Sequence, residues 1–213
     1  MTLTESILQK YHSEFDKGVK HPLPAQLCTG TLEDSVLWTY MHQDLLFFNL
    51  GLNVFGQVLR LCDHPPLMIV LGKQIGFISN DENDYFTRVL KELKDAGVSG
   101  PEDLLLPRVK EYLDYLQELR ESDSYVEVIT AMWLFEKFYL EWPLANPIKD
   151  GLPYKHQKWI DLHAGPEFLQ WVDFLASEVD RVGNANPKLV EDTFAKALDL
   201  EIAFFEDCYT YKQ

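Results

Sequence analysis

Three carboxylates in this sequence, Asp44, Glu136 and Glu201, have apolar residues at all four positions one helical turn away, and no other Asp or Glu has this surround. Residues three and four apart lie on one face of a helix, so each acid is expected to project from an apolar stripe toward the interior. Burying a carboxylate is costly unless it is paired, hydrogen-bonded, protonated or used by a ligand. Three such acids in one core would line an acidic pocket.

Aromatic residues stand beside these acids, among them Phe47, Trp133, Tyr139 and Phe204. Such side chains can stack on a flat ring, while a carboxylate can pair with the edge of an aminopyrimidine through its exocyclic amine and a ring nitrogen. Each acid alone fits equally well with a buried structural group that has protein partners, and each aromatic alone is more often part of a core. The combination favours a pocket for a heteroaromatic ligand.

The acids do not have the spacing of a metal site. Helical bundles that bind a pair of irons carry a Glu-x-x-His motif on each of two helices, whereas the third residue after each acid here is Phe47, Tyr139 or Phe204. The three cysteines of the chain also lack metal-type spacing and are expected to be reduced thiols. We therefore expect no metal and no cofactor.

The net charge of −15 over 213 residues limits the partners of this chain. A surface this acidic repels phosphate backbones, and no local basic patch offsets it, so nucleic acid binding is not expected. The longest apolar runs fall well short of a membrane-spanning helix, and the first residues lack the basic and apolar segments of a secretory signal. These features predict a cytoplasmic protein that makes no use of a membrane.

Apolar residues recur with helical spacing through nearly the whole chain, and strand-like alternation is scarce. Thr31 with Asp34 resembles a capping box that opens a long helix, and Pro187 suits a first helical turn. Pro143 and Gly151 mark a loop. Helices are predicted over residues of about 31–61, 67–95, 107–120, 125–141, 155–162, 166–180 and 187–209.

These elements predict an all-α fold, a single-domain helical bundle over residues 1–213 with a central ligand pocket. The three unusual acids fall in the middle of three different long helices. Ligand sites in bundles are built from side chains on facing helices, so a cavity bordered by Asp44, Glu136 and Glu201 is the predicted site. Long amphipathic helices offer interfaces, and a homo-oligomer is expected.

An ordered set of segments resembles the TenA family, the thiaminase II relatives of thiamin pyrimidine salvage. The matching segments are, in order, Gly30-Thr31-Leu32, Tyr40-Met41-His42-Gln43-Asp44, Tyr125 to Trp133, Glu136 with Tyr139, Lys158-Trp159-Ile160, and Leu200-Glu201 with Phe204. The resemblance runs from about residue 5 to about residue 209. It implies the TenA-like, haem-oxygenase-like helical fold, no cofactor, and a dimer or tetramer.

One departure from that family concerns its nucleophile. Thiaminase II members carry a cysteine where this sequence has Phe135, and no other cysteine of the chain can replace it. The sequence is therefore similar to the Cys-lacking branch, in which a Glu at the position of Glu136 is characteristic. That branch implies hydrolysis of N-formyl-aminomethyl or aminomethyl pyrimidines, which releases hydroxymethyl aminopyrimidine. A non-catalytic aminopyrimidine-binding protein and a weak thiaminase II stay open as alternatives.

The acids and one tyrosine have expected roles in such a hydrolysis. Glu136 would activate water, since its carboxyl pKa can be raised by an apolar surround. Asp44 would hold the edge of the aminopyrimidine. Glu201, by the resemblance, would exchange a proton with the ring or the leaving group. Tyr139 would orient Glu136 or donate a hydrogen bond to the developing oxyanion.

The remaining site residues are expected to contact the ring. Phe47 and Trp133 are the residues predicted to stack on it. Phe204 lies close to Glu201 in the sequence and is expected to line the same pocket. His163 stands where the Cys-bearing members have a Tyr, and it is expected at the entrance of the pocket, although a structural role is equally compatible with its position.

Overall fold

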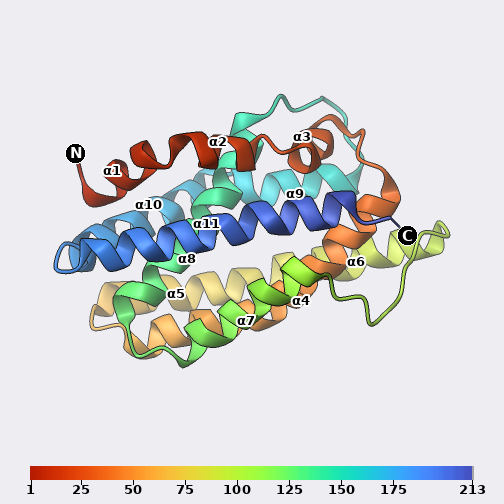
Figure 1. The fold of residues 1–213 in the computed structure, drawn as a ribbon. Coiled ribbons are helices and arrows are strands. Elements are labelled where there is room, and N and C mark those ends of the chain that lie inside the picture. The colour runs from red at the N-terminus through yellow and green to blue at the C-terminus, as the bar shows by residue number, and fades with distance from the viewer. Residues whose placement is uncertain (213) are drawn as a thin grey trace.

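The computed structural model describes residues 1–212, and every regular element in that range is helical (Figure 1). In chain order these elements are α1 (Leu3–Lys10), α2 (His12–Val19), α3 (Pro22–Thr29), α4 (Asp34–Leu61), α5 (Pro65–Phe77), the π-helical turn η1 (Ile78–Glu82), α6 (Asn83–Asp95), α7 (Pro107–Glu121), α8 (Tyr125–Ala145), α9 (Tyr154–Ala164), α10 (Pro166–Gly183) and α11 (Pro187–Thr210). Their buried apolar side chains form one cluster. The predicted all-α fold is confirmed, and in the described range no helix has the length and apolarity to cross a membrane.

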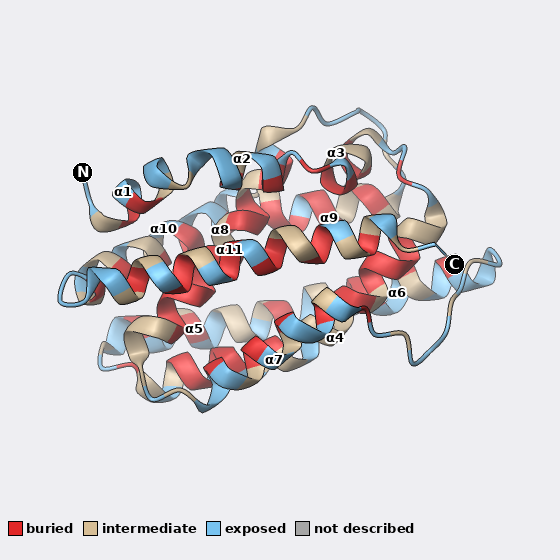
Figure 2. Cartoon of the chain, viewed as in Figure 1, coloured by how far each residue is buried: buried red, intermediate tan, exposed pale blue. Residues whose placement is uncertain are grey.

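Helix α8 lies inside the bundle, in contact with α4, α9, α10 and α11 (Figure 1). Every residue from Val128 to Phe135 is buried, whereas α7 and α11 each keep an exposed face (Figure 2). A helix that is apolar on all sides must be enclosed on all sides, which explains why so many helices surround α8. This position brings Glu136, the residue after the buried run, against α4 and α9.

Most predicted helix boundaries agree with the structure within a few residues, but two features differ. The capping box at Thr31 is absent, because α4 begins at Asp34 and the Thr31 hydroxyl instead shares a hydrogen bond with Thr29 (2.9 Å). Pro143, predicted to lie in a loop, is inside α8, which ends at Ala145. A proline this close to the end of a helix removes one hydrogen bond of the last turns, and the helix continues past it.

The helix predicted over residues 67–95 is found as a continuous helical segment whose register changes once. Helix α5 runs directly into η1, and η1 runs directly into α6. A π-helical turn adds one residue to a helical turn and is frequent at functional sites. The two ends of this turn, Ile78 and Glu82, both border the cavity described below.

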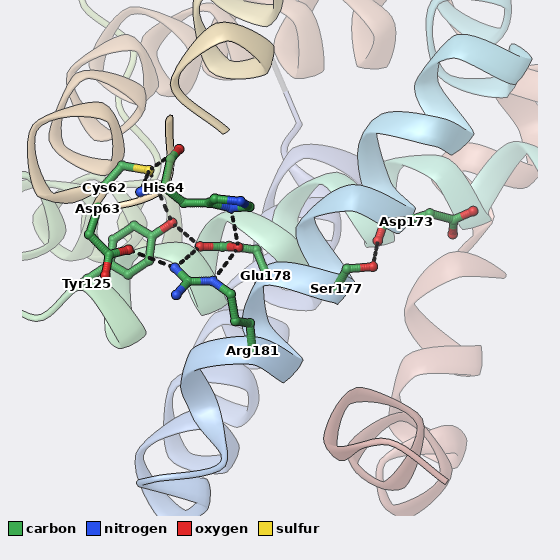
Figure 3. A network of polar contacts seen from close by, with 8 residues as sticks. All are labelled: Cys62, Asp63, His64, Tyr125, Asp173, Ser177, Glu178 and Arg181. Carbon is green, nitrogen blue, oxygen red and sulfur yellow. Dashed lines mark hydrogen bonds and ion pairs between the residues drawn. The ribbon is translucent and has the colours of Figure 1, made fainter. Parts of the chain in front are cut away.

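A polar network joins the starts of α5 and α8 to α10 (Figure 3). Glu178, which is 3% exposed, accepts hydrogen bonds from the Tyr125 hydroxyl (2.9 Å) and from Arg181 Nε (2.9 Å), and His64 Nδ1 lies 3.3 Å from it. Arg181 also pairs with Asp63 (2.8 Å). Both oxygens of this buried carboxylate have partners within the protein, so Glu178 needs no ligand and holds three helices together.

Candidate functional site

A cavity lies between α4, η1, α8 and α9. The volume that the centre of a water molecule can occupy in this cavity is about 70 Å³. A cavity needs only about 10–15 Å³ of such volume to hold one water. The cavity therefore has room for a small ring. It is bordered by Asp44, Phe47, Phe48, Gly51, Leu52, Phe55, Ile78, Glu82, Phe86, Phe135, Glu136, Tyr139, Trp159, His163 and Phe168.

Asp44, in the middle of α4, borders this cavity and is 3% exposed. Its Oδ1 accepts a hydrogen bond from the Tyr139 hydroxyl (3.2 Å). The Tyr139 hydroxyl in turn accepts one from the Tyr40 hydroxyl (3.3 Å), and the Tyr40 hydroxyl accepts one from Trp159 Nε1 (3.0 Å). Tyr139 therefore orients Asp44, and not Glu136 as one prediction had it. The Asp44 Oδ2 atom is buried and has no partner, so a donor on a ligand would complete its hydrogen bonding.

The protonation of Asp44 is balanced between two effects. Burial raises the pKa of its carboxyl to about 7, and the hydrogen bond from Tyr139 acts in the opposite direction, as does the nearby hydroxyl of Tyr40. At neutral pH both forms of the carboxyl are therefore populated. A ligand that donates hydrogen bonds would favour the ionised form, because it supplies the partner that burial has removed.

Glu136 enters the same cavity from α8. Burial raises the pKa of its carboxyl to about 7, and the indole N–H of Trp171 opposes this shift although it falls short of hydrogen-bond geometry. A carboxyl whose pKa lies near neutrality can both take a proton from water and return it. Glu136 thus has the protonation behaviour that a general base needs.

Glu201 lies behind the cavity wall. It is 1% exposed, its Oε1 accepts a hydrogen bond from the Tyr112 hydroxyl (2.6 Å), and its Oε2 has no partner. Burial raises the pKa of Glu201 well above its usual range; the Tyr112 hydrogen bond lowers it, and the charges of Asp44 and Glu136 raise it further. Coulombic effects weaken with distance, so the three acids lie near one another, but only Asp44 and Glu136 border the cavity.

His163 borders the cavity from α9 and is buried, so it belongs to the wall and not to an entrance. Its Nδ1 lies 2.8 Å from the backbone oxygen of Trp159, which places the proton on Nδ1 and leaves Nε2 as an acceptor. Burial lowers the pKa of the imidazole to about 4. Its ring packs against Tyr139 and Phe168, with centroids 5.1 and 5.2 Å away. His163 is therefore a neutral group at physiological pH.

The predicted ring-stacking residues divide into two groups. Phe47 borders the cavity and packs edge-on against Phe135, with centroids 5.6 Å apart. Trp133 does not border the cavity but packs against Phe194 (5.5 Å). Phe204 is also absent from the cavity wall and is 1% exposed. Trp133 and Phe204 are therefore core residues in this structure, and their predicted ring contacts do not fit where their side chains lie.

A fourth acid, Glu82, borders the cavity and was not predicted from the sequence. It is the last residue of η1. Burial raises the pKa of its carboxyl well above the usual range, and the charges of Glu136, Asp44 and Asp81 raise it further. Three of its four neighbours one helical turn away are apolar, and Ser79 is the exception. A search that allowed one small polar neighbour would have found Glu82.

The described residues contain no group of three or more His, Cys, Asp or Glu side chains that could hold a metal. The cysteines of the chain, Cys28, Cys62 and Cys208, are free and buried, and none of them borders the cavity. Phe135 borders it instead. The groups that the wall offers for chemistry are thus three carboxyls, the Tyr139 hydroxyl and a neutral imidazole, and the described wall includes no Lys or Arg.

Fold and site together define an all-helical protein with a buried, acid-lined pocket for a small ligand. A family model described as "TENA/THI-4/PQQC family" matches residues 5–211. Since this match spans nearly all of the sequence, the chain belongs to that family, in agreement with the resemblance found in its motifs.

Individual relatives are distant. The chain is similar to an "Aminopyrimidine aminohydrolase" of Halalkalibacterium halodurans, 23% identical over 221 residues that cover 98% of this chain and 96% of that protein. It is also similar to a "Probable bifunctional TENA-E protein" of Glycine max, 26% identical over 155 residues that cover 70% of this chain but only 65% of the soybean protein.

Solved structures give the same fold. A TenA homologue from Pyrococcus furiosus superposes with a TM-score of 0.82 at 18% identity, covering 97% of this chain and all of that one (100%). A TenA homologue from P. horikoshii superposes with a TM-score of 0.78 at 23% identity, covering 98% and 99% of the two chains. These likenesses support the helical architecture and carry no information on the reaction.

Proposed function

We propose that this protein is a hydrolase of thiamin-pyrimidine salvage that cleaves the C–N bond of an aminomethyl aminopyrimidine, or of its N-formyl derivative, in the pathway that yields hydroxymethyl aminopyrimidine. The observation that carries the proposal is the Oδ2 atom of Asp44, which is buried and unpartnered at the edge of a ring-sized cavity. An exocyclic amine and a ring N–H are donors suited to this carboxylate. Phe47 supplies an aromatic face for the ring.

The chemistry follows from the groups around that ring. With an aminomethyl substrate, Glu136 takes a proton from water as the water oxygen bonds to the methylene carbon, and the bond from that carbon to the amine breaks as the departing nitrogen takes up a proton. The products are ammonia and the hydroxymethyl pyrimidine. With an N-formyl substrate, the same base directs water to the formyl carbon, the amide C–N bond breaks with a proton added to its nitrogen, and formate and the aminomethyl pyrimidine are released. Water attacks directly in both cases, since Phe135 occupies a place where a thiol would be needed for a covalent adduct.

Charge at the cavity limits the substrate. Three carboxyls and no Lys or Arg are among its wall residues, so a phosphate on the substrate would be repelled and left without a partner. The proposed substrate is therefore an unphosphorylated pyrimidine whose amine is neutral or positively charged. A protonated amine would be attracted by the carboxyls and would favour their ionised forms.

The proposal extends to a residue behind the cavity wall and to the wider family. Glu201 acts through Tyr112, to which it is hydrogen-bonded, by holding negative charge or a proton next to the site. Membership of the Cys-lacking branch is consistent with Phe135 in the wall and with the name of the soybean relative. A homo-oligomer and a cytoplasmic location stay predictions, as does a single domain over residues 1–213.

The test is a turnover assay with purified protein. Wild type is incubated with aminomethyl and N-formyl-aminomethyl aminopyrimidine, and ammonia and formate are measured. Glu136→Gln is expected to lose a factor of about 10²–10⁴ in kcat, the usual contribution of a general base, while ligand affinity is retained. Glu141→Gln is the matched control, since Glu141 lies on the same helix, pairs with Lys137 and does not border the cavity.

Two results would contradict the proposed function. Tight binding of the pyrimidine by wild type with no release of ammonia or formate would indicate a carrier. Release of free thiazole from thiamin, with neither pyrimidine turned over, would indicate a residual thiaminase. Loss of activity in Glu136→Gln and Glu141→Gln alike would remove Glu136 from its specific role.

A further inference from the structure

The acid that the mechanism above leaves unused is Glu82. It borders the cavity together with Glu136 and Asp44, which come from two other helices. It takes part in no hydrogen bond or ion pair with the described residues, in contrast to Glu178, whose carboxylate is fully paired. Glu82 is half-buried, and a carboxyl that faces apolar wall residues without a protein partner is costly unless it carries a proton or serves a ligand.

The π-helical turn explains how Glu82 reaches the cavity. The residue before it, Asp81, is exposed and lies 4.0 Å from Lys158 at the surface. The first and last residues of the turn, Ile78 and Glu82, border the cavity. Because a π-turn contains one extra residue, it shifts which side chains of the following helix face inward. The distortion therefore places an acid among apolar wall residues, and its cost to the fold suggests a use.

The surroundings of Glu82 favour its protonated form. Acids face it from every element that contributes a charge: Glu136 from α8, Asp44 from α4 and Asp81 from its own turn, and the imidazole of His163 on α9 is neutral. Burial is the largest effect on its pKa, which lies well above the usual range. Glu82 and Glu136 border one cavity from different elements, and two carboxyls placed in this way can act as the acid and the base on one substrate.

We propose that Glu82 is the general acid of the reaction, the group that donates a proton to the departing nitrogen while Glu136 accepts one from water. This assignment depends on the proposed function. The C–N bond breaks with its electron pair going to nitrogen, the Glu82 proton joins that nitrogen, and the water oxygen joins carbon. Glu136 then holds the proton taken from water and passes it, directly or through solvent, to the Glu82 carboxylate, so both groups return to their starting forms.

The other groups near the cavity are poorer donors. Glu201 lies behind the wall and is hydrogen-bonded to Tyr112. The proton of His163 is on Nδ1, where it is used in the hydrogen bond to the backbone oxygen of Trp159. The Tyr139 hydroxyl already donates to Asp44. Glu82 is the wall acid whose surroundings favour its protonated form and whose carboxyl has no hydrogen-bond partner among the described residues.

The test compares two leaving groups in one set of variants. Glu82→Gln keeps the shape of the side chain but not its acidic proton, and Glu82→Asp keeps the proton on a shorter arm. Asp84→Asn is the control, because Asp84 is exposed two residues away and does not border the cavity. Each protein is assayed with the aminomethyl pyrimidine, which releases ammonia, and with a quaternary N-pyridinium analogue, which releases neutral pyridine. Circular dichroism and the thermal midpoint check folding.

Glu82→Gln is expected to lose about 10²-fold or more in kcat with the ammonia leaving group and less than about tenfold with pyridine, which leaves as a neutral molecule and needs no proton. KM is expected to change little. Glu82→Asp should retain more activity than Glu82→Gln, and the fall in wild-type kcat at high pH should disappear in Glu82→Gln. A merely structural role would lower both substrates' rates equally.

The outcomes separate this inference from the function on which it depends. Equal losses for the two leaving groups, or wild-type rates in Glu82→Gln, would overturn the role of Glu82 while the function stands. Absence of turnover by wild type with either substrate would overturn both. A folded Glu82→Asp with full activity, beside an unfolded Glu82→Gln, would still support an acidic group at this position.

Discussion

Replacing Asp44 by Asn should make the ligand-free protein more stable, and more so as the pH rises. The carboxyl has a pKa of about 7 when folded against 3.8 for the free group. Between these values the unfolded chain has lost the proton that the folded protein retains, so stability falls as pH rises through this window. A difference of about three pKa units lowers the free energy of unfolding by at most about 4 kcal/mol, since each unit corresponds to about 1.4 kcal/mol.

The assay is urea unfolding at pH 5 and pH 8 of wild type, Asp44→Asn and the exposed control Asp84→Asn. From pH 5 to pH 8, the advantage of Asp44→Asn over wild type should grow by about 2–3 kcal/mol, which follows from the same two pKa values. Any pH-independent effect of the amide, including its hydrogen bond with Tyr139, cancels in this difference. An advantage that is the same at both pH values, or that shrinks toward pH 8, would refute the idea that burial controls the protonation of Asp44.

Two further predictions concern the hydrogen bonds of buried acids. Tyr139→Phe removes a hydrogen bond that lowers the pKa of Asp44, so less of the Asp44 carboxyl is ionised at pH 7. Pyrimidine affinity measured by calorimetry should therefore fall about tenfold at pH 7 and recover in part above pH 8, where Asp44 is ionised again. Unchanged affinity at both pH values would count against this. For Glu178, burial raises the pKa but the bonds from Arg181 and Tyr125 outweigh it, so its folded pKa is lowered. Its stabilising effect is present above the unfolded pKa and is lost as the pH falls through the folded one. Glu178→Gln should therefore unfold about 1–3 kcal/mol more easily at pH 7, and this deficit should shrink as the pH falls below the unfolded pKa; a deficit that does not change with pH would contradict this.

The helical fold could be predicted because it depends on periodicity, which the sequence carries directly. Long helices such as α4, α7 and α11 have regular apolar stripes, and proline or asparagine marks several of their ends. Local signals failed where packing overrides them. Pro143 stays helical because the surrounding core holds the end of α8, and the π-turn at Ile78–Glu82 has no motif of its own. Helices α1 to α3, which lie before residue 31, were not among the predicted helices.

The candidate site could be predicted in part. Asp44 and Glu136 stand out because their apolar neighbours are on their own helices, and the wall of the cavity is built from those same faces. Trp133 precedes Glu136 by three residues on α8, so the two side chains are offset by about 60° around the helix, and the Trp133 ring packs against Phe194 instead of bordering the cavity. Whether Glu201 borders the cavity depends on contacts between different helices, which residue spacing does not encode.

A structure of the protein with hydroxymethyl aminopyrimidine bound would test the account of the pocket most directly. We expect the ring in the cavity, with its amine or a ring N–H within hydrogen-bond distance of Asp44 Oδ2, while Oδ1 keeps its bond from Tyr139. The hydroxymethyl carbon should lie between the carboxyls of Glu136 and Glu82. A ring bound elsewhere on the protein, or held in the cavity with its donors turned away from Asp44, would contradict the proposed recognition and the reaction derived from it.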